Sequence, residues 1–139
     1  MQTLEKTGPK SIDWAAGIFE GEGCINVHSY YKGVPYYEAQ IMMTDADVLE
    51  EFHNTVGLGH LRGPYYRKRE HCKPVYQWSV VKQSELKEFL ELILPHLCRR
   101  RTEKAREALK VINAKLVAKA KAANAKLVAK AAVEMMMDF

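Results

Sequence analysis

The sequence lacks several features that would assign it to common protein classes. Its three cysteines are odd in number, widely spaced and never in a C-x-x-C pair, so they indicate neither a disulfide framework nor a zinc site. No apolar run approaches the ~20 residues of a membrane-spanning helix. The N-terminal segment MQTLEKTGPK has neither an apolar signal core nor the Arg-rich pattern of a transit peptide. We therefore expect a protein of the reducing cytoplasm, without a membrane partner.

Two His/Cys pairs do not change this interpretation. His71 and Cys72 are adjacent, and His96 and Cys98 lie two positions apart. Neither pair has the further ligands that a zinc site needs, so we expect these side chains to be solvated.

The sequence does contain an ordinary globular composition with locally concentrated positive charge. Hydrophobic residues make up 47% and charged residues 27% of the 139 residues, which is the size of one domain. The formal net charge is only +4. Basic residues nevertheless concentrate in two short stretches, which contain Arg62, Arg67, Lys68, Arg69 and Lys73, and then Arg99, Arg100 and Arg101. Such clusters favour a polyanionic partner, because binding depends on local neutralisation of phosphates; each cluster alone is equally compatible with a solvated surface.

Turn and capping residues divide residues 11–95 into helices and strands. A first helix is expected from the N-cap Ser11 to about Gly21, a second over 45–57 after Thr44, and a third over about 85–94 after Ser84. Alternating stretches predict two strand pairs, at 24–31 with 36–43 and at 59–66 with 74–81. The predicted class is therefore α+β in the order αββαββα, with a four-stranded antiparallel sheet backed by helices.

From about Leu97 the sequence favours helix continuously, because it is rich in Ala, Lys, Arg, Glu and Leu. The octapeptide NAKLVAKA begins at Asn113 and recurs at Asn124, an offset of eleven residues. Eleven residues are close to three helical turns, so one stripe of the helix collects Lys115, Lys119, Lys126 and Lys130.

These patterns divide the chain into three parts. We expect an N-terminal arm over 1–10, a folded domain over 11–112, and an Ala/Lys-rich repeat helix over 113–139 that extends the last helix of the domain.

The segment AAGIFEGEG, from Ala15 to Gly23, does not fit an ordinary core helix. Gly17 and Gly21 lie four apart and share a helix face, where each costs ~1 kcal/mol relative to Ala. Small residues on one face allow the same helix of a second subunit to approach closely about a two-fold axis. Two such helices would bring two Glu22 carboxylates together, and their repulsion favours a hard divalent cation beside them.

With these residues, AAGIFEGEG resembles the LAGLIDADG signature of homing endonucleases and related maturases. The resemblance extends over roughly Ser11 to Ile112, because the αββαββα order, the MTDADVLEEF stretch and the LPHLCRRR stretch are also similar to that family. It implies a saddle-shaped sheet and a homodimer that cuts double-stranded DNA during intron homing. It also implies Mg²⁺ or Mn²⁺ as cofactor, no small-molecule cofactor, and a cytoplasmic, nucleoid-associated location.

The resemblance assigns roles to individual residues. It makes Glu22 the metal ligand, with the carbonyl of Gly21 as a second ligand; most members have Asp at this position, and Glu lengthens the arm by one methylene. Arg100 would line the active site where Lys is more usual, and its fixed charge cannot act as a general base near neutral pH. The acid corresponding to Glu20 is mainly structural in the family. The predicted dimer contact consists of Ala16, Gly17, Glu20 and Gly21.

Strand alternation predicts which side chains face the core and which face the DNA. The predicted core-facing set is Ile25, Val27, Ala39, Ile41, Leu61, Tyr76, Trp78 and Val80. The predicted DNA-binding set is Asn26, His28, Tyr30, Lys32, Glu38, Gln40, His60, Arg62, Arg67, Lys68, Arg69, Lys73, Gln77, Ser79, Arg99 and Arg101. Arg, Gln and Asn suit the reading of base edges, whereas Lys mainly contacts phosphate; the expected base readers are Asn26, Gln40, Arg62 and Gln77.

The size of the target follows from the strands, and the resemblance implies one further role. A strand of ~8 residues spans about eight base pairs, so two subunits would read a pseudo-palindromic site on the order of twenty base pairs. The family also has a water-positioning residue near the end of the second strand. Gln40 and Thr44 are the polar candidates, Met42 would be a departure, and the register is left open.

Other interpretations remain open at this stage. The same fold could serve a nucleic-acid binder that does not cut, either an intron maturase or a DNA-binding regulator. An unrelated α+β structural domain with a basic helical tail predicts no stable dimer through the first helix. The lysines of the repeat helix either contact DNA flanks or only aid solubility.

Overall fold

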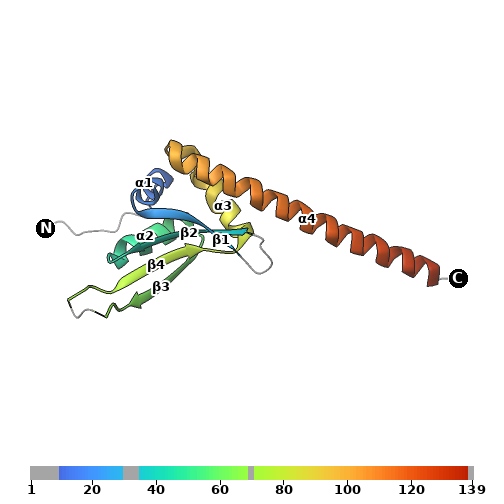
Figure 1. The fold of residues 1–139 in the computed structure, drawn as a ribbon, viewed down its shortest axis with the longest axis horizontal. Helices are drawn as coiled ribbons and strands as arrows, with labels where there is room; N and C mark the ends of the chain where they lie inside the picture. The colour runs from blue at the N-terminus through green and yellow to red at the C-terminus, as the bar shows by residue number, and fades with distance from the viewer. Residues whose placement is uncertain (1–9, 30–34, 69–70, 138–139) are drawn as a thin grey trace.

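The computed structural model describes residues 10–29, 35–68 and 71–137. The elements, in order, are α1 (Ile12–Glu22), β1 (Gly23–Ser29), β2 (Pro35–Met43), α2 (Ala46–Val56), β3 (His60–Tyr65), β4 (Val75–Val80), α3 (Gln83–Ile93), the short 3-10 helix η2 (Leu94–His96) and α4 (Arg99–Met137). The strands form one antiparallel sheet in the order β1-β2-β4-β3. The predicted α+β class, the αββαββα order and the long C-terminal helix are confirmed (Figure 1).

Helix α1 begins and ends where its sequence indicates. The hydroxyl of Ser11 accepts a hydrogen bond from the Trp14 N–H at 3.2 Å and caps the helix. At the other end, the Gly23 N–H closes the last turn on the Phe19 carbonyl. The chain passes directly from α1 into β1, so the end of the glycine-rich segment lies at the edge of the sheet.

The starts of α2 and α3 differ from the predictions by one and two residues. Asp45, rather than Thr44, is the N-cap of α2, while Gly57 ends the helix as expected, in the left-handed conformation with φ 68°. Lys82, rather than Ser84, is the N-cap of α3. The reason is tertiary: the amide of Gln83 donates to the carbonyls of Tyr37 at 2.9 Å and Val81 at 2.7 Å, which fixes the first turn of α3 against β2.

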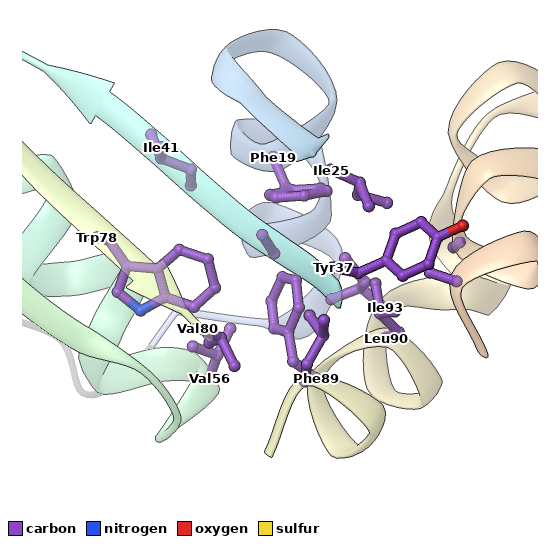
Figure 2. Packing of buried hydrophobic residues seen from close by; sticks show 14 of the residues in the cluster. Phe19, Ile25, Tyr37, Ile41, Val56, Trp78, Val80, Phe89, Leu90 and Ile93 are labelled. Carbon is purple, nitrogen blue, oxygen red and sulfur yellow. The ribbon is translucent and has the colours of Figure 1, made fainter. Parts of the chain in front are cut away.

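The core lies between the sheet and the helices and is centred on aromatic rings (Figure 2). The Phe89 ring centroid lies 4.8 Å from that of Trp78 and 5.2 Å from that of Phe19, within the range of favourable aromatic pairs. The Trp78 indole N–H donates to the Leu58 carbonyl at 2.9 Å, so its polar atom is satisfied inside the core. All four α-helices contribute side chains to this single cluster, which places them on one face of the sheet.

Two residues predicted to be in the core are exposed. Val27 and Leu61 point to the helix-covered face, but 49% and 37% of their surfaces are exposed. Both belong to edge strands, β1 and β3, where fewer helices cover the sheet.

Helix α4 has a packed half and a free half. Ala105, Ala108, Leu109 and Ile112 are buried against the domain, and every residue from Val117 to Met137 is exposed. Figure 1 shows this second half continuing well beyond the sheet. Among the described residues, no helix combines the length and the apolar character needed to cross a bilayer.

Candidate active site and nucleic-acid interface

The end of α1, the start of β1 and the start of α4 form one corner of the molecule. Glu20 accepts a hydrogen bond from the Cys98 backbone N–H at 2.6 Å. Its other carboxylate oxygen lies 3.8 Å from Nη1 of Arg101. Arg101 in turn donates through Nη2 to the Gly23 carbonyl at 2.5 Å. These contacts hold the first turn of α4 against the end of the glycine-rich helix.

Arg101 makes its polar contacts within the chain, and these contacts do not favour its predicted contact with DNA. Its side chain is 24% exposed, and its guanidinium carbon lies 6.0 Å from the centroid of the Phe19 ring. The guanidinium is used by Glu20 and Gly23, which leaves little of it for a phosphate. Its neighbour Arg99 is almost fully exposed and pairs with Glu103 at 3.5 Å.

The two acids at the end of α1 have different environments. Glu20 is engaged by Cys98 and Arg101. Glu22 is exposed and makes no side-chain hydrogen bond or ion pair with the residues that the structure describes. Nothing within the described chain therefore competes for the Glu22 carboxylate.

Arg100 lies in the same corner, on the first turn of α4. It is exposed, and it lines an open cavity of about 370 Å³ together with Cys24, Ile25, Arg101, Glu103, Lys104 and Glu107. No cluster of three or more His, Cys, Asp or Glu side chains within residues 10–29, 35–68 and 71–137 forms a metal cage. At this corner, the described residues thus present the free carboxylate of Glu22, the Gly21 carbonyl and the guanidinium of Arg100, which has no partner among them.

The outer face of α1 agrees only in part with the predicted dimer contact. Ala16 is 1% exposed within the single chain, so its side chain offers almost no surface to a second subunit, and that part of the predicted dimer contact needs correction. Gly17 and Gly21 are exposed, and a Cβ atom at either position would meet no described atom within 4 Å. The packing of one chain therefore does not require glycine at these two positions.

Strand register defines the face of the sheet opposite the helices. Residues directly across a ladder point to the same face, and one row runs through all four strands as Cys24, Gln40, Ser79 and His60. A second row contains Met42, Gln77 and Arg62. Toward the far end of β1, Asn26 pairs with Glu38 and His28 with Tyr36. The predicted alternation of faces is thus seen in the sheet.

Several polar side chains on this open face contact one another. The Gln77 amide donates to the Gln40 carbonyl oxygen at 3.1 Å, so two of the expected base readers are paired. Nε2 of His28 lies 3.9 Å from Glu38, and the His28 ring stacks on Tyr36 with centroids 4.9 Å apart. Tyr36 was not among the predicted DNA-binding residues, although the alternation through Glu38 and Gln40 would have identified it.

The other predicted DNA-binding residues do not all lie exposed on the open face of the sheet. Ser79 lies in the central row but is 4% exposed, so its neighbours largely cover it. Lys73 precedes β4 in an exposed loop rather than in the strand. Arg67 and Lys68 are exposed after β3. Tyr30, Lys32 and Arg69 lie outside the described residues.

On the opposite, helix-covered face of the sheet, the buried Tyr37 marks the packing of α4 on β2. Burial raises the pKa of its hydroxyl, and the nearby carboxylate of Glu107 raises it further. Nζ of Lys104 lies 6.0 Å from the centroid of the Tyr37 ring. The first turns of α4 are therefore packed on the sheet as well as on α1.

Comparison with solved structures identifies the architecture. The chain superposes on the homing endonuclease I-GzeII, solved with its DNA target, with a TM-score of 0.67 and 15% identity over 85% of this chain. It superposes on I-CvuI and I-TnaI with a TM-score of 0.57 and 24% identity over 73% of this chain. This chain has the LAGLIDADG homing-endonuclease fold. A scan of family models and a search of curated proteins found no match.

The LAGLIDADG fold covers different shares of these structures. The matched region is 65% of the I-CvuI chain, 70% of I-TnaI and 40% of I-GzeII. The I-CvuI structures are DNA complexes obtained with magnesium, in which the DNA is not cleaved, and with calcium. In this chain, the corner that contains Glu22 and the open face of the sheet are two surfaces with exposed polar side chains.

Proposed function

We propose that this protein is a metal-dependent DNA endonuclease that acts as a homodimer on a pseudo-palindromic site. One observation carries the proposal. Of the two acids at the end of the glycine-rich helix, Glu20 is used to hold α4 in place, whereas Glu22 is exposed and unpaired among the described residues. A carboxylate that is exposed beside an exposed pair of glycines suits a site completed by a second subunit and a substrate.

The donor set at this position fits a hard divalent cation. The Glu22 carboxylate and the Gly21 carbonyl are oxygen donors, which Mg²⁺ and Mn²⁺ prefer over nitrogen or sulfur. When bound there, such an ion supplies an activated water and neutralises charge at the phosphate. One chain offers too few ligands to fill the ~6 positions of such an ion, so the remainder would come from the second subunit, the DNA phosphates and water.

Arg100 suits a role in stabilising the phosphate. Its fixed positive charge lies on the first turn of α4, and the contacts of Glu20 with Cys98 and of Arg101 with Gly23 hold that turn beside α1. A guanidinium presents a planar set of N–H donors that matches phosphate oxygens. Arg100 would bind the scissile phosphate as negative charge develops on it.

The dimer would form along α1. Gly17 and Gly21 leave room for a helix backbone to approach, because no described atom lies within 4 Å of a Cβ placed at either position. The two-fold axis would then bring the two Glu22 residues together, one for each DNA strand.

The open face of the sheet would read the DNA. Asn26, Gln40, Arg62 and Gln77 all lie on it by register, and amide and guanidinium groups suit adenine and guanine edges in the major groove. The similarity in fold to I-GzeII, a structure with its DNA target, supports this assignment.

A cleavage screen tests the proposal. The purified chain is incubated with Mg²⁺ or Mn²⁺ and a library of randomised pseudo-palindromic duplexes, and the cut products are sequenced. We expect cleavage of a narrow set of sites, its loss in Glu22→Gln, and unchanged binding of that variant to the selected site. Glu88→Gln, which alters an exposed acid on α3, is the matched control and should cut like the parent. Binding without cleavage by the parent in either metal would instead support a maturase or a regulator.

The dimer is tested separately with Gly17→Ala. In a single chain this change should favour the helix by ~1 kcal/mol, because the added methyl group has free space. At a close helix contact between subunits, the same methyl group would clash. We expect the molecular mass in sedimentation to fall toward that of a monomer; a mass equal to that of the parent would contradict the α1 interface.

A further inference from the structure

The free half of α4 is helical without packing against the rest of the described chain. Residues 117–137 are exposed throughout and extend past the sheet (Figure 1). Ala and Lys, which dominate this segment, are among the residues with the highest helix propensities, and the segment continues a helix that the domain has already nucleated. Its shape therefore needs no apolar partner.

The part of α4 that includes Lys110, Lys115 and most of this free half carries more net positive charge than the chain as a whole. Residues 108–133 contain six lysines and no acidic residue, while the net charge of the entire chain is only +4. The remainder of the chain is therefore net negative. For a DNA-binding domain this is an unfavourable balance, and residues 108–133 of α4 reverse it.

Four of these lysines lie on the side of α4 that faces the domain. Ala108 and Ile112 are buried on that side, and Lys115, the next residue along it, donates through Nζ to the Pro35 carbonyl at the start of β2. With 3.6 residues per turn, the positions four, eleven and fifteen residues after Lys115 fall on the same side. We name the lysine stripe the set Lys115, Lys119, Lys126 and Lys130.

The stripe therefore continues the sheet-facing side of α4 beyond the end of the sheet. Its first member is anchored at the β1–β2 end of the sheet through Pro35. The remaining members extend outward from that point along the free helix. A duplex lying across the open face and continuing past this end would meet the stripe next.

We propose that the lysine stripe binds the phosphate backbone of duplex DNA flanking the base pairs that the sheet reads. From Lys115 to Lys130 the helix rises ~22 Å, which corresponds to about six base pairs. The inference rests on the DNA binding proposed above and adds a flanking, sequence-independent contact in each subunit.

The chemistry of the segment favours a duplex over other polyanions. Lysine is a mobile point charge that suits phosphates. Residues 113–137 contain no aromatic side chain on which unpaired bases could stack, as single-strand binders require. They also contain no Arg or Gln, and their two Asn residues, Asn113 and Asn124, do not lie on the sheet-facing side of the helix. The stripe therefore has no side chain that reads base edges in pairs of hydrogen bonds.

Two matched double variants test the stripe. Lys119→Gln with Lys130→Gln removes two charges from the stripe. Lys110→Gln with Lys121→Gln removes two charges, with the same eleven-residue spacing, from the opposite side of the same helix. Gln has nearly the helix propensity of Lys, and circular dichroism verifies that both variants keep the parent's helix content.

Binding is measured by fluorescence anisotropy at several salt concentrations. The probe is a duplex of arbitrary sequence and about 40 base pairs, long enough for the sheets and stripes of a dimer. For each subunit bound, we expect the stripe variant to reduce the slope of log K against log salt by about 1.8, since each phosphate contact contributes ~0.9. The opposite-side variant should keep the slope of the parent. A single-stranded RNA of the same length is measured in parallel.

Each outcome decides the proposal. Equal slopes for the two variants, or a stripe variant that weakens only the RNA, would overturn it. A parent that binds no duplex would overturn it together with the proposed DNA binding. A parent that binds DNA through the stripe but never cuts would leave this inference standing and reject the endonuclease.

Discussion

Replacing Glu20 and Glu22 one at a time separates a structural acid from an acid that the fold leaves free. Glu20→Ala removes the acceptor of the Cys98 N–H at 2.6 Å and the partner of Arg101 at 3.8 Å. Arg101, which is 24% exposed, would lose its nearest carboxylate, and the first turn of α4 would lose one of its ties to α1. Glu22→Ala removes no hydrogen bond and no ion pair among the described residues.

The magnitudes follow from these contacts. A hydrogen bond to a charged group contributes ~1.5 to 3 kcal/mol, and a partly exposed ion pair adds at most ~1 kcal/mol. We expect Glu20→Ala to lower the free energy of unfolding by about 2 to 3 kcal/mol and the melting temperature by roughly 6 to 9 °C for a chain of this size. Glu22→Ala should change the free energy of unfolding by less than about 0.5 kcal/mol.

The assay is thermal and urea unfolding followed by circular dichroism. All proteins are compared at one concentration, because the stability of a dimer depends on concentration. DNA cleavage should show the reverse order, with activity lost in Glu22→Ala and retained by folded Glu20→Ala below its melting temperature. A Glu22 variant that is destabilised as much as the Glu20 variant would refute the assignment of the two acids.

Three further predictions concern the scaffold. Phe89→Ala should cost about 3 to 5 kcal/mol, because the ring is fully buried against Trp78 and other aromatic residues; a loss below about 1 kcal/mol in urea unfolding would show that the core is not packed as described. Gly59→Ala should cost at least ~2 kcal/mol, since Gly59 has φ 87° and a Cβ there would lie 2.6 Å from the Trp78 indole nitrogen; its melting temperature measures this, and an unchanged value would contradict the loop geometry. Burial and Glu107 raise the pKa of Tyr37, so the unfolded chain ionises first and stability should fall as pH rises above about 10. Tyr37→Phe should reduce that fall in alkaline unfolding curves, and an identical pH dependence would argue against the raised pKa.

Local sequence pattern was sufficient to predict the order of the helices and strands and the two faces of the sheet. Ser11 caps α1 and Gly57 ends α2, because capping depends on a few neighbouring residues. The open face containing Gln40 and Gln77 follows from a period of two, which is set by the pleat of the strand itself.

Contacts between distant segments determined the features that local sequence pattern did not predict. Arg101 and Glu20 are 81 positions apart in sequence, yet they pair within one chain. Arg101 was predicted to contact DNA and Glu20 to contact a second subunit. The depth of Ala16, Ser79, Val27 and Leu61 depends on which helix or strand covers each residue, which no periodicity specifies. The N-cap of α3 is Lys82 and not the predicted Ser84, because Gln83 forms a hydrogen bond to Tyr37 in β2.

The repeat helix shows the same division between sequence and tertiary structure. Its composition by itself determined that 113–137 is helical and that four lysines form a stripe, because helix propensity and the 3.6-residue period are local properties. The direction of that stripe was decided by packing: Ala108 and Ile112 are buried on the domain, and Lys115 bonds to Pro35. A rigid helix carries the orientation of its packed half into its free half, so only the tertiary structure could show that the lysines continue the sheet-facing side.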